Sequence, residues 1–512
     1  KSLFLLISFA AYMPISIAPS FAAVADNTTP VLDSSINGGN VGINGSINVG
    51  GKDYNNFEVN MAKGAGKGGV GLFDWGSFDV GKNVAVNWIF NANGQKAINR
   101  VMNTGKASEI YGALTSSCAG NCSYAKTSSV ILINPNGIMF GQGSMVNLGS
   151  FTASTMDING LEKAKQDFIN GKVPTIKTGK RADGSTFTYN SYGKTDVLRT
   201  QFGNGVPITF DRSHVDSNGN GVITLDGAKF NVEGFTNGEP KTQATSVALI
   251  ADKIDIKNKS TIQTYEDPNK NGNFGNGYAR SNVKLITADG VTLSYGDWGQ
   301  VSEADAAGNS LVHIQEKTVA AGEEGKYGIS ISGGSQIYSG SVQVENKVKN
   351  AKVSINNSTL WGRKLNNATT GEISVKSSGD IEIVNSRLET MKGAASDAAN
   401  PEKSNAYGNI TILADKNITI DNTRIYSAPS DLNNGLANGA DAKAGNILIK
   451  SKEGNINIKK SAEALAEGNS QVGNLPINIV SYGNLRLEAD YGTVKTDFTK
   501  GGYTKIAGKY NT

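Results

Sequence analysis

A glycine-led segment recurs in the C-terminal half of this 512-residue chain, and the repeat limits the possible folds more than any other feature. Its four copies begin at Gly371, Gly408, Gly445 and Gly483, so successive starts are 37, 37 and 38 residues apart. Each copy reads as three short strands separated by turns, and a polar insertion such as 427–444 completes the period. Three strands within about 20 residues is typical of one turn of a parallel β-helix.

A single coil of this kind cannot bury its own apolar face, whereas stacked coils bury a continuous apolar column. We therefore predict an all-β fold, a right-handed parallel β-helix with loop insertions, over residues from about 31 to 505. Asn and Gly should occupy the corners, where Asn side chains could stack in ladders. A β-sandwich is the alternative, but it favours hairpin turns over a regular recurrence. The residues expected to stack inward are Ile373, Val375, Ile410, Ile412, Ile447 and Ile449.

Composition narrows the functional classes. The chain has 62 Gly but only 2 Cys and 2 His, which excludes a disulfide-rich scaffold and disfavours Cys-based zinc modules or a His-rich metal enzyme. The net charge of +4 over this length does not support electrostatic binding of nucleic acid.

The N-terminus resembles a secretory signal peptide, which we place at residues 1–25. An apolar stretch runs from Leu3 to Met13, and Ala23-Val24-Ala25 fits the rule for cleavage before Asp26. A membrane anchor is the alternative, although proline and serine interrupt its core. Because the chain begins with lysine, we expect it to start inside a longer precursor.

Secretion would place the chain in an oxidising compartment, so we predict a disulfide between Cys118 and Cys122. Three residues separate the two cysteines, and the bridge would close a small loop. A metal site would need further ligands, and the nearest histidine is His214.

The segment Asn134-Pro135-Asn136-Gly137-Ile138 reads as a tight turn between two apolar strands. Proline at the second position presets φ, the side chain of Asn134 can bond forward, and Asn-Gly tolerates positive φ. The simplest interpretation is that this turn only shapes the first coils.

We predict no catalytic, metal or cofactor site. The loop beginning at Asp216 matches a calcium loop at its start, but Gly227 stands where the bidentate glutamate belongs, which favours a polar turn. Acidic residues are scattered, and we expect His214 and His313 to be incidental. One or two helical turns are expected over Leu161–Ile169.

Five short elements follow one another in the N-terminal third of the chain, at residues 75–81, 98–101, 108–114, 132–141 and 146–155. The fourth contains Asn-Pro-Asn-Gly-Ile. In this order the elements resemble the secretion domain of the filamentous haemagglutinin family, the exported partners of two-partner secretion. Weaker similarity continues to about residue 295. Two features depart from the family pattern: an Asn-Pro-Asn-Leu motif is absent, and the segment around Cys118 and Cys122 lengthens a turn.

The resemblance implies three parts: a signal peptide (1–25), a secretion domain (26–295) and a β-helical repeat shaft (296–512). It also implies that a dedicated outer-membrane β-barrel transporter recognises residues 134–138, with a secondary motif formed by Asn99, Arg100, Asn147 and Leu148. The expected protein is a non-enzymatic adhesin of a Gram-negative bacterium. It would pass through the periplasm to the cell surface or medium.

Its further partner would be a receptor or glycan on a host or bacterial surface. Two alternatives remain open at this point: a stalk that delivers a toxin or cytolysin, and a β-helical enzyme acting on glycans.

Overall fold

The computed structural model describes the chain from residue 24, with gaps. Most of the predicted signal peptide, the loop beginning at Asp216, His214 and Cys122 lie outside the described residues. The described ranges are 24–62, 68–101, 105–118, 128–169, 196–212, 221–232, 246–264, 281–295, 313–364, 371–392, 408–427, 446–459 and 479–496, with short strands at 179–180, 186–187, 301–302 and 507–511.

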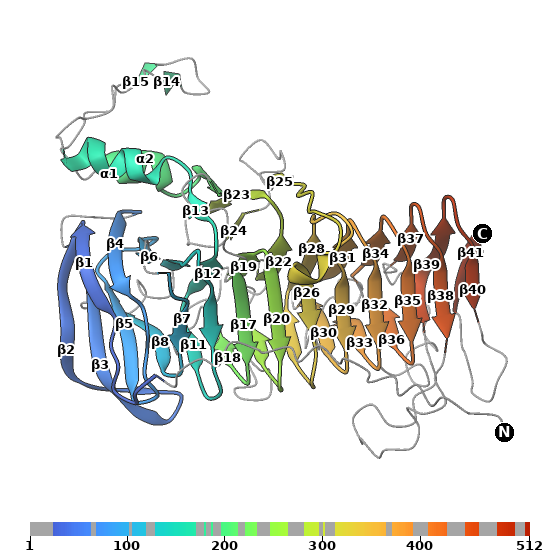
Figure 1. The fold of residues 1–512 in the computed structure, drawn as a ribbon, viewed down its shortest axis with the longest axis horizontal. Coiled ribbons are helices and arrows are strands. Elements are labelled where there is room, and N and C mark those ends of the chain that lie inside the picture. The colour runs from blue at the N-terminus through green and yellow to red at the C-terminus, as the bar shows by residue number, and fades with distance from the viewer. Residues whose placement is uncertain are drawn as a thin grey trace, which may run out of the picture.

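The prediction of a right-handed parallel β-helix is confirmed (Figure 1). Each coil contributes one strand to each of three parallel ladders, which we call the first, second and third faces. Strands of one face pair in parallel with those of the coils before and after.

The first face contains the longest ladder of parallel strands. They are β4 (Val70–Ser77), β6 (Lys96–Val101), β9 (Ser129–Ile133), β12 (Ser150–Ser154), β19 (Ser246–Ala251), β22 (Asn282–Thr287), β28 (Ser341–Asn346), β31 (Glu372–Ser377), β34 (Ile410–Ala414), β37 (Ile447–Ser451), the end of β39 (Ile479–Ala489) and β41 (Ala507–Asn511).

The second face consists of shorter strands. They are β7 (Ser108–Ile110), β10 (Ile138–Phe140), β17 (Val222–Asp226), β20 (Lys253–Lys257), β26 (Gly328–Ile331), β29 (Val353–Asn356), β32 (Ile381–Val384), β35 (Ile418–Asp421), β38 (Ile456–Lys459) and β40 (Val494–Thr496).

The third face completes each coil. Its strands are β3 (Lys52–Met61), β5 (Val84–Phe90), β8 (Ala113–Cys118), β11 (Met145–Asn147), β18 (Lys229–Asn231), β21 (Thr261–Gln263), β27 (Gln336–Ser339), β30 (Thr359–Lys364), β33 (Arg387–Lys392), β36 (Arg424–Ser427) and the start of β39.

The interior column forms as the repeat predicts. Ile373 pairs with Ile410, which pairs with Ile447, and the neighbouring row of Val375, Ile412 and Ile449 follows the same register. All six side chains are buried in the main core. The 37-residue spacing therefore keeps like residues above one another, so apolar contacts and backbone hydrogen bonds reinforce each other along the axis.

Asparagine occupies the corners, as expected. Asn258, Asn357, Asn385 and Asn422 follow second-face strands and adopt positive φ, a conformation that asparagine tolerates better than most residues. Asn422 Nδ2 donates to Asn385 Oδ1 at 2.8 Å, so the predicted side-chain ladder exists at this corner.

The first strands differ from the prediction, which began the parallel coils near residue 31. β1 (Val31–Ile36) pairs with β4, and β2 (Gly38–Val49) pairs with β3; both pairings are antiparallel. No earlier coil is described that could pair with them, so they form a cap over the end of the column. The β2–β3 register is irregular at two places, and irregular edges resist pairing with other chains.

An outer layer covers the first face near the N-terminal end and encloses a second apolar core (Figure 1). This core contains Ile98, Ile131 and Ile250, whose side chains point away from the main core. The helix expected over Leu161–Ile169 is present. The layer consists of α1 (Leu161–Ile169), α2 (Asp196–Phe202) and the antiparallel strands β13 (Asp157–Ile158), β16 (Pro207–Asp211), β23 (Gly290–Tyr295), β24 (Val301–Ser302) and β25 (His313–Gln315).

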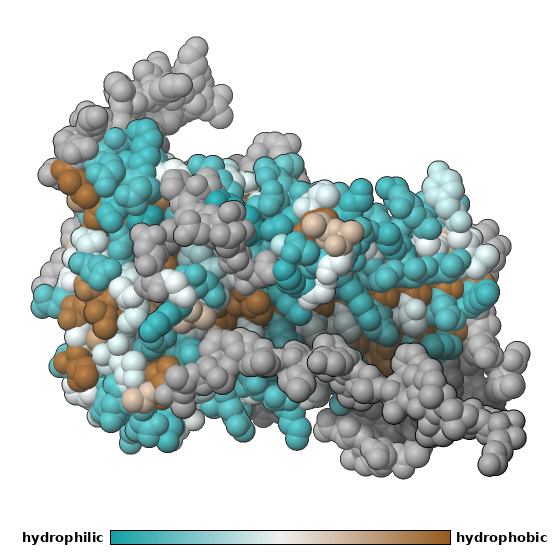
Figure 2. Space-filling model, viewed as in Figure 1, coloured by the Kyte–Doolittle hydropathy of each residue, from teal (hydrophilic) through white to brown (hydrophobic). Residues whose placement is uncertain are grey.

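Two small elements complete the description: the antiparallel pair β14 (Gly179–Lys180) and β15 (Thr186–Phe187), and a 3₁₀ helix at Glu324–Lys326. Hydrophilic residues dominate the visible surface (Figure 2). Within the described residues, neither α-helix has the length and apolar character needed to cross a membrane.

Replacing Ile412 with Asp should destabilise the protein by several kcal/mol, because the carboxylate would be buried without a partner. The matched control is Thr411→Asp, which adds the same charge at the neighbouring, outward-facing position. Denaturant unfolding of both variants provides the measurement. Equal losses of stability would contradict the inward stacking of Ile412.

Candidate functional site

Asn134 follows β9 and starts the turn that leads into β10. The Gly137 amide donates to Asn134 O at 3.0 Å, which closes a four-residue β-turn with proline at its second position. The backbone N–H of Asn134 donates to Ser154 O at 3.0 Å and connects the turn to the next coil. This geometry follows directly from the local sequence.

The side chain of Asn134 is fully buried and uses both ends of its amide. Its Nδ2 donates to Lys106 O and to Ser108 Oγ, each at 3.0 Å, in the preceding coil. Its Oδ1 accepts a hydrogen bond from the backbone N–H of Asn136 at 3.0 Å. This is the forward bond that the sequence predicted. Asn134 therefore fastens a corner of one coil to the coil before it.

The other residues of the motif have different environments. Gly137 adopts φ 113°, and an added Cβ would lie 3.0 Å from Val222 O in the following coil. Pro135 and Ile138 are buried, whereas Asn136 is exposed. Asn136 Nδ2 makes one long contact, 3.4 Å to Asn134 Oδ1. Asn136 is thus the one asparagine of the motif that another molecule could reach in the folded protein.

Asn99 lies in the main core, where it binds two tryptophans. Its Oδ1 accepts from Trp75 Nε1 and Trp88 Nε1, both at 3.2 Å. Its Nδ2 donates to Ala97 O and Ile131 O, also at 3.2 Å. One buried amide therefore satisfies two indole N–H groups that would otherwise be costly to bury.

Arg100, the next residue, points outward and binds the outer layer. Arg100 Nε and Nη2 bond to Asp74 at 2.9 and 3.3 Å, and Nη2 also bonds to Glu162 of α1 at 2.9 Å. Asp157 of β13 lies 3.5 Å from Nη1. Arg100 thereby joins a coil strand to the helix and sheet that cover it.

The charges around Arg100 shift one another's pKa values. Burial alone would raise the pKa of Asp74, but hydrogen bonds and charges from Arg100 and Lys165 hold it below its usual value. The pKa of Glu162 is lowered by hydrogen bonds from Gln166 and Arg100 and by the charges of Arg100 and Lys165, against its own burial. Asp74 and Glu162 are therefore ionised at neutral pH and pair with the guanidinium.

The second pair of the secondary motif lies on the third face. Leu148 is buried in the main core at the corner after β11, whereas Asn147 is half-buried and faces outward. Asn147 lies opposite Thr115 of β8.

Only part of the secondary motif lies next to the turn at residues 134–138. Arg100 pairs in register with Ile133, the residue before Asn134, so these two elements share one corner of adjacent coils. Asn147 and Leu148 belong to a different face. The residues predicted as the secretion motif and the secondary motif thus lie at several points of the first coils, and their role in recognition stays a prediction.

The predicted disulfide involves a residue at the end of β8. Cys118 is disulfide-bonded, but its predicted partner Cys122 lies outside the described residues. The pairing of the two stays a prediction.

Sequence reasoning missed how the outer layer is held. Lys96 is completely buried under α2; its Nζ donates to Phe202 O at 2.7 Å and lies 4.4 Å from the centroid of the Tyr295 ring. Burial lowers the pKa of Lys96 to about 7. The fully apolar run 130–133 was the available signal, because a strand buried on both faces needs a second layer.

Within the described ranges, no group of three or more His, Cys, Asp and Glu side chains is placed to hold a metal ion. His313 is exposed on β25.

The parallel ladders and the second core over the first coils define the chain as a parallel β-helical protein with a covered N-terminal part. The family model for the TPS (two-partner secretion) domain matches residues 35–383, which is more than half of the chain. The chain belongs to this family. It is a secreted exoprotein of a two-partner system, and the family implies an outer-membrane transporter as the partner.

Two curated relatives from Haemophilus influenzae are both named heme/hemopexin-binding protein. Each is 32% identical, over 107 and 95 residues, which cover 21% and 19% of this chain. These segments amount to 11% and 9% of the relatives, so the chain matches about a tenth of their length.

Two solved structures are also similar. The HMW1 secretion domain from Haemophilus influenzae gives a TM-score of 0.43 at 16% identity, covering 91% of this chain and 100% of that one. The filamentous hemagglutinin secretion domain gives 0.33 at 11% identity, covering 91% and 99%.

Replacing Arg100 with Met should cost about 3–5 kcal/mol of stability, because Asp157 would remain buried without this cation and Asp74 would keep only Lys165 as a cationic partner. The control is Lys163→Met, which breaks an exposed pair with Asp167 on α1 and should cost less than about 1 kcal/mol. Urea unfolding compares the two. Similar losses for both variants would contradict the anchoring role of Arg100.

Acidification should lower the free energy of unfolding, because protonation of Asp74 removes its ion pairs with Arg100 and Lys165. The pKa of Asp74 is lower in the folded protein than in the unfolded chain, so its contribution is complete above about pH 3.9 and is lost as the pH falls through the folded value. Unfolding free energies from pH 7 to 2 provide the measurement. The Asp74→Asn variant should be less stable at pH 7 and should lose less stability on acidification than the wild type.

Proposed function

We propose that this exoprotein is a non-enzymatic adhesin, carried to the bacterial surface or medium through the periplasm. The observation that carries this proposal is the family match, which begins in the N-terminal cap and extends through the coils to β32. The β-helical shaft beyond the first coils would hold the binding surface away from the cell. A receptor or glycan on a host or bacterial surface would be its target.

Recognition by the transporter would use Asn134 and Asn136. In the folded coil the side chain of Asn134 is fully buried, and both its Nδ2 and its Oδ1 are hydrogen-bonded, so a partner cannot reach it. We infer that the transporter reads Asn134 before the coil closes, while the chain is extended. An extended segment can add as a strand to the edge of a sheet in the transporter's periplasmic part. Folding outside the cell would then bury the motif.

We propose a division between secretion domain and shaft near residue 295, although the family match continues to residue 383. A change on the outward side of the first face supports this proposal. On the outward side of the first face, Ile250 pairs with Ile286, which pairs with Glu345 in the next coil. The outer layer covers the coils whose outward residues are apolar, and the coils beyond the layer have polar residues at these positions. Coil stacking itself continues without a break from β22 to β28.

Two alternatives are less well supported. An enzyme acting on glycans would need a cluster of acid or base groups on one outward face, whereas members of the matched family are non-enzymatic exoproteins. A toxin stalk would use the same secretion domain, and sequence beyond residue 512 would distinguish it. Heme binding does not transfer from the named relatives, because the match covers about a tenth of them.

Asn136→Ala is the cleanest test of recognition. Asn136 is exposed and makes one long side-chain contact, so the purified variant should keep the wild-type melting temperature. Export should nevertheless fall, measured as protein in the medium or on the surface against periplasmic degradation products.

Asn134→Ala should lower both export and stability, because four hydrogen bonds involve this residue's side chain. Cleavage of the signal peptide should continue in both variants. Normal export of the double variant would leave the turn with a structural role alone.

A further inference from the structure

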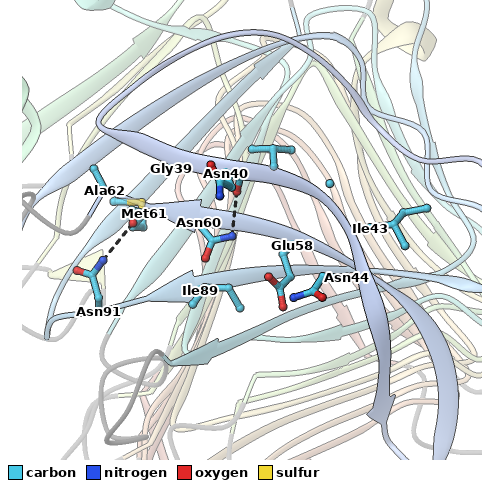
Figure 3. A pocket seen from close by; sticks show the side chains of 12 residues that line it. Gly39, Asn40, Ile43, Asn44, Glu58, Asn60, Met61, Ala62, Ile89 and Asn91 are labelled. Carbon is cyan, nitrogen blue, oxygen red and sulfur yellow. Dashed lines mark hydrogen bonds between the residues drawn. The ribbon is translucent and has the colours of Figure 1, made fainter.

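A groove lined by both polar and aliphatic residues lies in the N-terminal cap and the third-face strands beside it (Figure 3). Its volume is about 520 Å³, enough for one or two sugar rings. The strands β2, β3 and β5 line it. Figure 3 shows Asn44, Glu58 and Ile89, from these three strands, facing the same space.

Several polar groups that face the groove make no hydrogen bond within the described chain. These are the side-chain amides of Asn40 and Asn44, both exposed, and the Oδ1 of Asn60, whose Nδ2 donates to Asn40 O at 2.9 Å. Glu58 offers its Oε2, while its Oε1 accepts from Asn56 at 3.0 Å. The groove thus presents both donors and acceptors.

Two further amide oxygens, on β3 and β5 but outside the groove's lining, have no hydrogen-bond partner among the described residues. Asn56 Oδ1 and Asn87 Oδ1 are buried and accept no hydrogen bond, and the two residues are only 7% and 2% exposed. Asn56 sits between the groove residues, since its Nδ2 donates to Asn44 O at 3.1 Å and to Glu58. Asn87 lies directly opposite Glu58 in register. Buried acceptors of this kind normally have a donor.

We propose that this groove binds an uncharged saccharide. A sugar hydroxyl both donates and accepts, so it suits a lining of amides, one carboxylate and unpartnered acceptors. The aliphatic side chains of Val41, Ile43 and Ile89 can contact the C–H surface of the ring; Ile43 is 64% exposed. No Lys, Arg or His lines the groove within the described chain, and Glu58 would repel a sulfated or sialylated glycan.

This inference deepens the proposed adhesive function by naming a ligand class and a site. A peptide strand is the competing occupant, because β2 pairs only with β3 among the described strands and so has a free edge. The irregular β2–β3 register disfavours strand addition at this edge, and binding of peptides alone is one of the test's outcomes.

The test uses the purified full-length protein on a printed array of uncharged, sialylated and sulfated glycans. The best uncharged oligosaccharide is then titrated by calorimetry. We expect binding to uncharged glycans, weakened at least tenfold by Asn44→Ala and by Glu58→Gln, with unchanged melting temperatures. The control Glu372→Gln removes an exposed carboxylate from β31 and should bind like the wild type.

Three results would overturn the inference: no uncharged glycan binding up to about 10 mM, binding confined to anionic glycans or peptides, or titration curves unaffected by both groove variants. Adherence of cells that display the protein separates this inference from the proposed function. If cells that display the wild type and cells that display the groove variants adhere equally, saccharide binding in the groove is contradicted and the adhesive function is supported. If the purified protein binds glycans in the groove but no cells adhere, the binding site is supported and the adhesive function is contradicted.

Discussion

The fold depends on one repeated interaction, the in-register stacking of each coil on the previous one. An inward row such as Val375, Ile412 and Ile449 gains burial only if the backbone ladders hold the same register, and the ladders hold only if the apolar row fits. Cooperation between these two sets of contacts explains why strands of four or five residues suffice. It also makes an end coil without a neighbour a problem, which the antiparallel β1 and β2 resolve here.

The N-terminal coils differ from the shaft because they are packed on both sides. Ile131 and Ile133 face the outer layer, while Val130 and Leu132 of the same strand face the column. A layer that rests on apolar contacts alone could slide, and the Arg100 cluster fixes its position by pairing with side chains of defined geometry. Stability of the secretion domain therefore depends on contacts between residues far apart in sequence.

Much of the fold could be predicted from the sequence, because the coil period and the apolar alternation appear directly in the chain. The tight turn at Asn134 and its forward hydrogen bond could also be predicted, since both depend on neighbouring residues. The partners of Arg100 could not, because Asp157 and Glu162 reach it only when the outer layer folds back on the coil. The groove could not be predicted for a similar reason. The Gly- and Asn-rich segment of β2 is typical of turns, and its side-chain amides form a groove with Glu58 only when β2 pairs with β3.

The burial of Asn134 links structure to export. A side chain that is fully enclosed and hydrogen-bonded cannot be both a folded corner and a recognition element at the same moment. If the transporter reads Asn134, as we propose, recognition precedes folding, and folding follows passage through the outer membrane. A chain that folded in the periplasm would hide Asn134 and would leave only the exposed side chain of Asn136 accessible.

The most direct measurement is the affinity of the transporter's purified periplasmic part for the secretion domain, residues 26–295, in two states. One sample is held unfolded in mild denaturant, and the other is folded and then brought to the same solvent. The account predicts binding of the unfolded chain, weakened by Asn134→Ala, and little binding of the folded domain. Equal affinity for the folded domain, unchanged by the substitution, would contradict it.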